Sequence, residues 1–366
     1  MTTPTRRKSK GTTMKMFSQA SGRRSGRAVG AAVAAIALST ALAACGSVGG
    51  ESGDGGDGGS DAGSIVFLPK QLNNPYTDVV LGGGEDGAAE TGMSASVLGP
   101  LEASASAQVP FIEQATQEQA SVIVIAANDP DAVGPSLQAA RDAGAKIVAF
   151  DSDTNPDYRD LFVSQVEAKD VALVQLEMIS EQIGGSGDVA ILSATATATN
   201  QNEWIRFMEE EIDSNPEYSG INIVTKVYGD DDADKSFKEA QGLLQSYPDL
   251  KGIISPTTVG IAAAAKYLST SEYKGKVALT GLGLPNEMRE FVKDGTVSEF
   301  ALWDPAQLGY VAAFAGKALA DGDITGAEGD TFEAGDLGER EVGADGIVIV
   351  GPPTKFNADN IDDYDF

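Results

Sequence analysis

Two carboxylates follow directly after an apolar strand, in the segment KIVAFDSDTNPDYRD from Lys146 to Asp160. Asp151 and Asp153 come immediately after the apolar run that ends at Phe150. In α/β proteins, ligands bind at the carboxyl ends of parallel strands. Acids placed there can accept hydrogen bonds from a ligand, take part in acid-base chemistry or cap a helix. Which of these applies depends on the other side chains that the fold brings to the same edge.

The composition excludes several kinds of chemistry. The 366 residues contain no histidine and one cysteine, Cys45, which excludes Ser-His-Asp catalysis, histidine-based zinc sites and an intrachain disulfide. The 26 Lys and Arg against 54 Asp and Glu give a net charge of −28, and phosphate contacts need a basic surface, so no nucleic-acid partner is expected. No P-loop is present, and the one loose dinucleotide fingerprint, residues 185–190, precedes a strand instead of following one. We expect neither a cofactor nor a metal.

The N-terminal segment has the pattern of an export signal. Residues 1–27 are basic and residues 28–44 form an uncharged, mostly apolar run that ends in the order Leu-Ala-Ala-Cys. This order resembles the bacterial lipobox, which implies that Cys45 becomes the lipidated first residue of the mature protein. The alternative is a transmembrane helix, but the run is short for a span, which needs about 20 apolar residues. We expect a signal peptide over residues 1–44, a flexible Gly/Asp/Ser tether over residues 45–63 and a lipid anchor on the outer face of the cytoplasmic membrane.

From Ser64 onward, strands and helices alternate, and most strands are continuous apolar runs, as in parallel sheets that helices cover on both faces. The predicted strands cover 64–69, 95–98, 121–126, 146–150, 188–193, 221–227, 251–255, 276–281, 298–303 and 346–350. The predicted helices cover 76–92, 108–119, 131–143, 168–183, 202–212, 234–246, 259–268, 286–294 and 305–320. The first of these helices has a glycine-rich interruption at 82–84.

Two runs of such units predict an α/β fold with two doubly wound parallel-sheet domains and a ligand cleft between them. We expect one lobe to comprise residues 64–163 plus about 303–345. The other should comprise residues 166–301 plus about 346–366.

Polar and aromatic side chains follow the carboxyl ends of these strands, and together they suit a sugar. Carboxylates and amides bond to hydroxyl groups, lysine donates strong hydrogen bonds, and aromatic faces cover the C–H side of a pyranose. The alternatives are a turn role for Asp153, a surface position for Lys70 and a core position for Trp303. The candidate ligand-binding residues are Lys70, Asn74, Tyr76, Asp151, Asp153, Asn200, Gln201, Pro256, Thr258, Trp303 and Asp304.

Several of these segments resemble those of the type I periplasmic sugar-binding proteins, over about residues 64–366. The matching segments are FLPK at 67–70, NPY at 74–76, FDSDTNP at 150–156, TATNQNEW at 197–204, ALWDPAQLG at 301–309 and the terminal FNADNIDDYDF. The nearest groups are the rhamnose-binding and autoinducer-2-binding proteins of ABC importers. The resemblance implies two lobes that close on a sugar and deliver it to a permease whose ATPase is a separate chain.

The same resemblance implies ligand contacts at Lys70, Asp151, Asn200, Gln201, Pro256 and Thr258. The autoinducer-2 binders typically have Asp-Gln where this chain has Asn200-Gln201, and a small apolar residue where it has Thr258. Rhamnose or a similar deoxyhexose is therefore favoured, with autoinducer-2 as the alternative. We expect a monomeric binding protein and no enzyme.

Two other classes of function remain open. A glycosidase would use a pair of carboxylates, for which Asp151 and Asp304 are the candidates. It is not favoured, because the polar set is rich in amides and no acid has evidently apolar surroundings. A signal receptor without transport is the third class.

Overall fold

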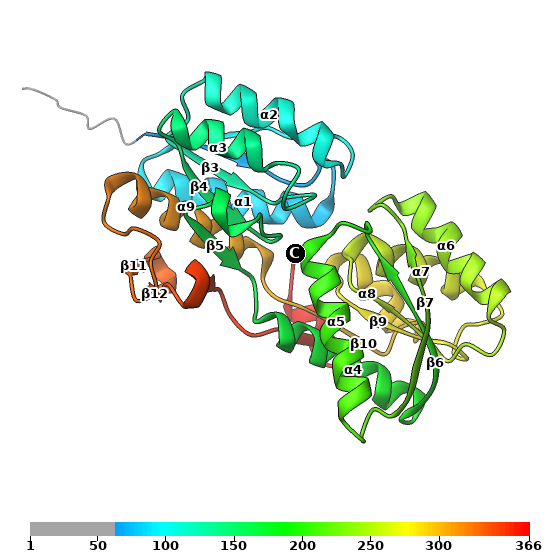
Figure 1. The fold of residues 1–366 in the computed structure, drawn as a ribbon. Helices are drawn as coiled ribbons and strands as arrows, with labels where there is room; N and C mark the ends of the chain where they lie inside the picture. Colours follow the sequence, from blue (N-terminus) through cyan, green and yellow to red (C-terminus); the bar gives the residue numbers. More distant parts are fainter. Residues whose placement is uncertain (1–62) are drawn as a thin grey trace, which may run out of the picture. The chain divides into compact units, whose positions relative to one another are not determined.

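The computed structural model describes residues 63–366, which form two α/β lobes built on separate parallel sheets (Figure 1). The predicted signal peptide (1–44), the predicted lipid site at Cys45 and the predicted tether up to residue 62 lie outside the described residues. Over residues 63–366, no helix has both the length and the apolar character needed to cross a membrane.

The first lobe is a six-stranded parallel sheet with the strand order β13-β5-β4-β3-β1-β2. Its strands are β1 (Ser64–Leu68), β2 (Ser94–Val97), β3 (Val122–Ile125), β4 (Lys146–Phe150), β5 (Leu161–Ser164) and β13 (Ile347–Ile349). Helices α1 and α9 cover one face and α2 and α3 the other. The helices are α1 (Pro75–Thr91), α2 (Ala105–Gln117), α3 (Gly134–Asp142) and α9 (Pro305–Asp321).

Both faces of this sheet are buried, which explains why its central strands are apolar throughout. On β1, Ile65 and Phe67 pack into the core beneath α1 and α9, whereas Val66 and Leu68 pack into the core beneath α2 and α3. Successive side chains of a strand point to opposite faces, so a strand covered on both sides has no polar position.

Helix α1 is continuous, so the predicted interruption at Gly82–Gly84 is wrong. Its glycines instead allow the backbone of α9 to approach closely. A Cβ on Gly83 would lie 1.9 Å from the carbonyl oxygen of Ala306, and one on Gly309 would lie 1.9 Å from that of Val80. The sequence does not distinguish a glycine that breaks a helix from one that admits a neighbouring backbone.

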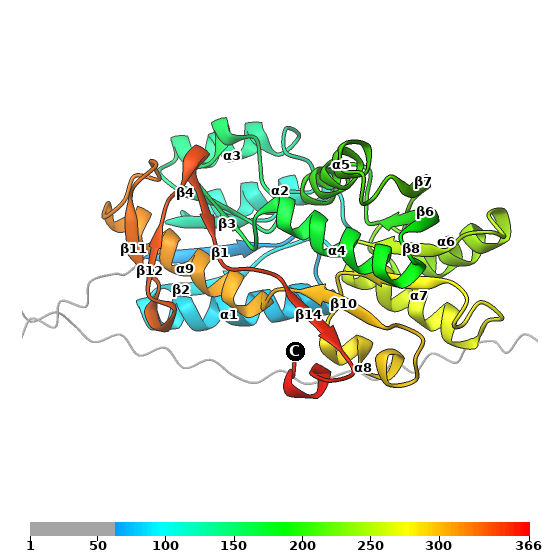
Figure 2. The ribbon, with the colours of Figure 1, turned by 90° about the horizontal axis from the view of Figure 1, so that it is seen from below.

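The second lobe is a four-stranded parallel sheet with the order β7-β6-β8-β9. Its strands are β6 (Ser186–Ser193), β7 (Gly220–Tyr228), β8 (Gly252–Ser255) and β9 (Ala278–Gly281). Helices α4 and α5 lie side by side on one face and α6 and α7 on the other, with α8 beside α7 (Figures 1 and 2). The helices are α4 (Ala168–Ile183), α5 (Thr199–Ser214), α6 (Ala233–Ser246), α7 (Thr258–Thr270) and α8 (Pro285–Lys293).

An antiparallel pair extends the second lobe, formed by β10 (Glu299–Leu302) and β14 (Thr354–Asn357). Phe300 and Phe356 stack across this pair and belong to the core of the second lobe. Figure 2 shows the pair beside α8, where the chain ends. The remaining elements are a hairpin of β11 (Thr331–Glu333) and β12 (Glu339–Glu341), and short 3-10 turns at 156–158, 335–337, 344–346 and 361–363.

The chain passes between the lobes three times, after β5, after β10 and after β13. The predicted assignment of residues 346–350 to the second lobe is wrong, because β13 pairs in parallel with β5 at the edge of the first sheet. Val348 and Val350 are buried in the core beneath α9. The apolar segment at 347–350 predicts a strand, but the local sequence does not indicate which sheet edge that strand will join.

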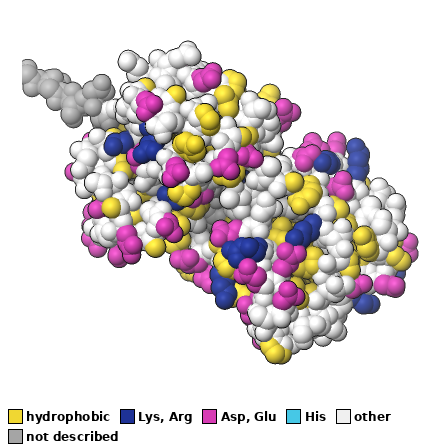
Figure 3. Space-filling model, in the orientation of Figure 1, with side chains coloured by type: hydrophobic (Ala, Val, Ile, Leu, Met, Phe, Trp, Pro, Cys, Tyr) yellow, Lys and Arg dark blue, Asp and Glu magenta, His cyan; other side chains and the backbone are white. Residues whose placement is uncertain are grey.

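Acidic and basic side chains are interspersed on the surface, although acidic residues are in excess over the whole chain. Figure 3 shows acidic side chains over this face of both lobes, with Lys and Arg side chains in small groups among them. Several basic side chains of the second lobe are paired with acids, namely Lys169 with Glu211, Arg206 with Glu210 and Lys226 with Glu209. Such exposed pairs contribute little to stability.

Candidate functional site

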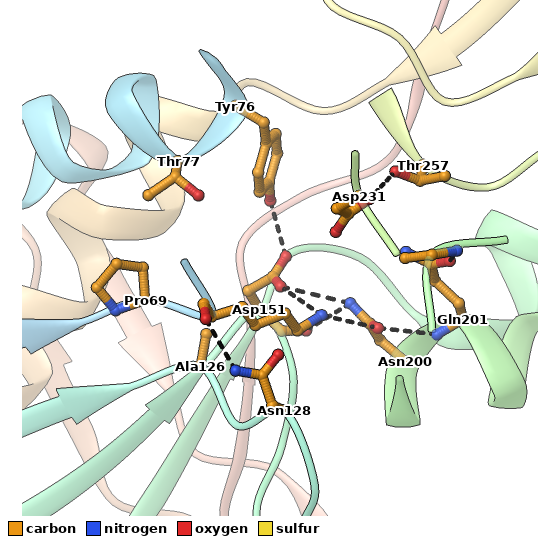
Figure 4. Close-up of polar contacts among 12 residues, drawn as sticks. Pro69, Tyr76, Thr77, Ala126, Asn128, Asp151, Asn200, Gln201, Asp231 and Thr257 are labelled. Carbon is orange, nitrogen blue, oxygen red and sulfur yellow. Dashed lines mark hydrogen bonds and ion pairs between the residues drawn. The ribbon is translucent and has the colours of Figure 1, made fainter. Parts of the chain in front are cut away.

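Side chains from both lobes line one cavity at the carboxyl ends of the two sheets (Figure 4). The cavity has a volume of about 60 Å³. Nine of the eleven predicted ligand-binding residues line it: Lys70, Asn74, Tyr76, Asn200, Gln201, Pro256, Thr258, Trp303 and, at the end of β4, Asp151. The structure therefore brings together residues that lie up to 233 positions apart in the sequence, counted from Lys70 to Trp303.

Local structure fixes the side chains of the first lobe. Lys70 follows β1, and Asn74 caps helix α1 by accepting hydrogen bonds from the backbone N–H groups of Tyr76 and Thr77 at 3.0 and 3.3 Å. This cap places Tyr76 in the first turn of α1, facing the cavity. Asp151 directly follows β4 and has a left-handed backbone conformation, with φ of 59°, which few residues other than glycine, asparagine and aspartate adopt.

Asp151 is the centre of a charged network. The ammonium of Lys70 lies 3.3 Å from Asp151 Oδ2, and the hydroxyl of Tyr76 donates to Oδ1 at 2.9 Å. Trp303 Nε1 donates in turn to the Tyr76 hydroxyl at 3.0 Å. Burial and the charge of Asp151 raise the pKa of Tyr76 well above its usual value, so this hydroxyl remains a donor. A nearly buried carboxylate is thus paired with a cation and hydrogen-bonded.

The amides of the second lobe lie in the first turn of α5. Gln201 Oε1 accepts from Ser193 Oγ at 2.6 Å and from the backbone N–H of Ala194 at 2.9 Å. Both bonds fall on the oxygen, so the Gln201 Nε2 group is the end left to donate to another acceptor. Asn200 Oδ1 accepts from Lys70 Nζ at 3.2 Å. These contacts fix which end of each amide faces the cavity.

Hydrogen bonds join the two lobes directly across the cleft. Asn200 Nδ2 donates to the backbone oxygen and to Oδ2 of Asp151, at 3.3 and 3.4 Å. Further bonds join Gln71 Nε2 to Asp231 O at 3.2 Å and Thr197 Oγ1 to Asn128 O at 3.0 Å. The groups best suited to a hydroxyl-bearing ligand are therefore bonded to one another, and such a ligand can exchange these bonds for its own.

Aromatic rings form one wall of the cavity. Trp303 packs edge-on against Tyr76 and Trp204, with ring centroids 6.1 and 6.0 Å apart. Trp303 is 4% exposed and belongs to the core of the second lobe, yet it also lines the cavity. Trp303 is therefore a core residue that also forms part of the cavity wall, and its contact with a ligand stays a prediction.

Asp153 and Asp304, the other two predicted residues, do not line the cavity. Both carboxylate oxygens of Asp153 accept from the Arg159 guanidinium, at 2.7 and 2.9 Å. Asp304 caps α9, with Oδ1 accepting from the backbone N–H of Ala306 at 3.0 Å. Asp153 thus fixes the loop after β4, and Asp304 begins a helix.

The sequence reasoning missed Asp231, which lines the cavity from the loop after β7. Its Oδ1 accepts from Thr257 Oγ1 at 2.5 Å. Burial raises the pKa of Asp231, while the bond from Thr257 and the charge of Lys70 lower it. Asp232, the next residue along the chain, caps α6. The signal for Asp231 was its position after a strand of the same sheet, at the edge where the other candidates were found.

Other residues line the cavity without having been predicted as contacts, among them the polar or aromatic side chains of Gln71, Thr77, Trp204 and Thr257. Over residues 63–366, no group of three or more Cys, Asp or Glu side chains is arranged to hold a metal ion.

Solved structures of sugar-binding proteins resemble this chain closely. A sugar ABC transporter from Actinomyces odontolyticus is 67% identical, over 84% of this chain and 98% of that one, with a TM-score of 0.69. An ABC transporter solute-binding protein from Clostridium phytofermentas with bound L-rhamnose is 37% identical, over 82% and 98%, with a TM-score of 0.80. LsrB from Clostridium saccharobutylicum in complex with AI-2 is 25% identical, over 83% and 100%, with a TM-score of 0.76.

A curated relative and a family model agree with these structures. The D-ribose/D-allose-binding protein of Pseudomonas aeruginosa is 24% identical over 202 residues, which are 54% of this chain and 62% of that relative, less than two thirds of its length. The model of the periplasmic binding protein domain matches residues 65–324. This match covers most of both lobes and spans every strand from β1 to β10. The chain belongs to the family of periplasmic binding proteins.

Proposed function

We propose that this protein is the extracytoplasmic solute-binding component of a sugar ABC importer. The observation that carries the proposal is the convergence of Lys70, Asp151, Asn200 and Gln201, from two lobes, on one cavity. The relatives named above support a sugar as the ligand, since they include binding proteins for rhamnose, ribose or allose, and AI-2. The partners would be a membrane permease and a separate ATPase chain, and the binding protein itself would act as a monomer.

In the proposed mechanism, the ligand stabilises the closed arrangement of the lobes. With the lobes apart, Lys70 and Asp151 would lie on one wall and Asn200 and Gln201 on the other. A sugar that bonds to both walls would replace the direct contacts between Lys70, Asn200 and Asp151. A ligand shifts such an equilibrium only by its difference in affinity for the two states, so bonds to both lobes are required.

The comparisons with solved structures support movement of the lobes. The 67% identical protein superposes less well than the 37% identical protein with bound L-rhamnose. Chains that are 67% identical are expected to share the fold of each lobe, and in the proposed mechanism a different angle between the lobes would account for the lower score. Hinge closure of two domains around a ligand is a known mode of conformational change.

L-Rhamnose is the favoured ligand. A deoxyhexose combines hydroxyl groups with one methyl group, and the cavity combines the polar groups described above with the apolar side chains of Leu81, Leu282 and Leu302. The sequence departs from the autoinducer-2 binders at Asn200, at Thr258 and in the Asn-Pro-Tyr segment at 74–76. Autoinducer-2 remains the second candidate, supported by the AI-2 complex of the 25% identical relative.

The geometry does not favour a glycosidase. Asp304, one of the two candidate carboxylates, caps α9 outside the cavity. A second carboxylate, Asp231, does line the cavity with Asp151, but Asp151 is paired with Lys70 and bonded to Tyr76. We expect no release of nitrophenol from nitrophenyl L-rhamnosides. Measurable turnover would contradict the proposal that the protein is a binding protein.

A thermal-shift panel tests the ligand directly. A ligand at about 100 times its Kd stabilises the folded state by about 2.7 kcal/mol, which corresponds to a rise in Tm of about 5 °C for a protein of this size. The panel comprises L-rhamnose, D-ribose, L-fucose, D-xylose, D-galactose, D-arabinose and autoinducer-2, with mannitol as the negative control. We expect such a rise with L-rhamnose and none with mannitol. A rise with autoinducer-2 alone would replace the favoured ligand, and no rise with any of them would contradict sugar binding.

Export and lipid anchoring at Cys45 are the second part of the proposal. The basis is the order Leu-Ala-Ala-Cys after an apolar run, at residues 42–45. We expect the full chain to fractionate with the membrane and to incorporate labelled palmitate, and the Cys45→Ser variant to do neither. Equal labelling of the two forms would exclude Cys45 as the site of modification.

A further inference from the structure

Asp231 stands apart from the other acids of the loop that follows β7. Asp230, Asp231 and Asp232 are consecutive, yet Asp230 pairs with Lys235 and Asp232 caps α6. Of the three, Asp231 alone lines the central cavity. Asp230 and Asp231 both have left-handed backbones, with φ of 55° and 51°, a conformation that few residues other than glycine, asparagine and aspartate tolerate. This conformation directs neighbouring carboxylates to different surroundings.

The Asp231 carboxylate is held by one oxygen and presents the other. Its Oδ1 accepts from Thr257 Oγ1 at 2.5 Å, which fixes the rotation of the carboxylate. In Figure 4 the second oxygen points away from Thr257, on the side of Asp151. A carboxylate oxygen accepts more than one hydrogen bond, and one that faces a cavity takes a donor from whatever fills that cavity.

Asp231 also lies where the cavity meets the outside. Gln71 and Asp231 line both the central cavity and an outer groove of about 750 Å³. The bond from Gln71 Nε2 to the backbone oxygen of Asp231 joins the two lobes between these spaces. In the proposed mechanism, closing the lobes would bring the Asp231 carboxylate to the cavity and form this contact between Gln71 and Asp231 at the same time.

The charges around the cavity make an ionised Asp231 carboxylate unfavourable for the folded protein unless a ligand donates a hydrogen bond to it. The charge of Lys70 lowers the pKa of Asp231, but Lys70 is already paired with Asp151. Burial and the charges of Asp151 and Asp230 raise that pKa. A second carboxylate beside an existing ion pair is unfavourable in the protein alone, and a hydroxyl group donating to it offsets this cost.

We propose that Asp231 is a ligand-contacting and specificity-determining residue, whose Oδ2 accepts a hydrogen bond from a hydroxyl of the bound sugar. The proposal rests on the proposed function and adds to it a second acceptor, from the lobe opposite Asp151. The ligand must then present hydroxyl donors on two sides, one toward each lobe. Asp231 thereby selects sugars by the position of the second hydroxyl.

The matched test compares Asp231→Asn with Asp230→Asn by isothermal titration of L-rhamnose, or of whichever sugar of the panel binds most tightly. Asn tolerates the left-handed backbone and keeps an oxygen for Thr257, but it turns a donor instead of an acceptor toward the cavity. Loss of a hydrogen bond to a charged group weakens binding by about 10-fold to 100-fold, and we expect this for Asp231→Asn. Asp230→Asn removes the same charge one residue away and should bind within twofold of wild type.

Deoxy analogues identify the hydroxyl that Asp231 selects. We expect one monodeoxy form of the sugar to bind the wild type at least tenfold more weakly than the parent, and to show no such difference with Asp231→Asn. This loss of discrimination is a coupling between a side chain and a hydroxyl, which a merely structural role would not produce. The unliganded Asp231→Asn protein should melt at or above the wild-type temperature, because burial raises the pKa of Asp231 and its negative charge therefore destabilises the folded state above the usual carboxyl pKa.

The outcomes separate this inference from the function on which it rests. If the wild type binds a sugar and Asp231→Asn binds it within twofold, the inference is wrong and the proposed function stands. If the wild type binds no sugar, both this inference and the proposed function are wrong. Should the variant not fold, a crystal structure of the wild type with the sugar decides, since Asp231 Oδ2 must lie within about 3.2 Å of a ligand hydroxyl.

Discussion

Asp151→Ala is expected to weaken sugar binding by at least about 2 kcal/mol, or about 30-fold in Kd. The substitution removes an acceptor that faces the cavity, and it leaves two buried donors without their partner. The Lys70 ammonium loses its counter-ion at 3.3 Å and the Tyr76 hydroxyl loses its acceptor at 2.9 Å. Breaking one side of a buried, bonded pair costs more than the pair contributes, because the remaining charge stays desolvated.

Calorimetry of three variants separates the causes. Asp151→Asn keeps an oxygen for Tyr76 and tolerates the left-handed backbone, so we expect a smaller loss than for Asp151→Ala. Asp153→Asn, two residues further along the same loop, is the matched control, because its carboxylate is bonded to Arg159 outside the cavity. It should lower the Tm without changing the Kd. An Asp151→Ala protein that binds within threefold of wild type would remove Asp151 from the site.

Gly83→Ala is expected to destabilise the first lobe by about 3 kcal/mol, and so to lower the Tm by about 6 °C. The added Cβ would lie 1.9 Å from the carbonyl oxygen of Ala306, which is backbone and cannot rotate away. Helices α1 and α9 would have to separate, in a core where packing is dense. The start of α1 carries Asn74 and Tyr76, so sugar binding should weaken as well.

The neighbouring residue gives a control within the same helix. A Cβ on Gly82 meets nothing within 4 Å. Because alanine is the better helix former by about 0.8–1.0 kcal/mol, Gly82→Ala should raise the Tm slightly. Differential scanning calorimetry of the two variants measures both effects. Equal Tm values would show that the separation of α1 and α9 adjusts to the extra methyl group.

The alternation of strands and helices was readable from the sequence because burial leaves a local signature. Strands covered on both faces have no polar position, and the predicted strand over 146–150 coincides with β4. The candidate site was also largely readable, since parallel strands end at a common edge. Asp151, Asn200 and Thr258 could therefore be placed together without knowing any distance.

The sequence by itself determined the α/β class, the exclusion of histidine chemistry and nine of the residues that line the cavity, because these depend on composition and on short-range patterns. Only the tertiary structure decided which sheet β13 joins, why α1 carries glycines, and that Asp231 faces the cavity while Asp153 does not. Three of these depend on a partner distant in the chain, namely β5 for β13, α9 for α1 and Thr257 for Asp231, whereas Asp153 is held by the nearby Arg159. A local pattern records whether a residue is buried or turns the chain, but not which distant group it meets.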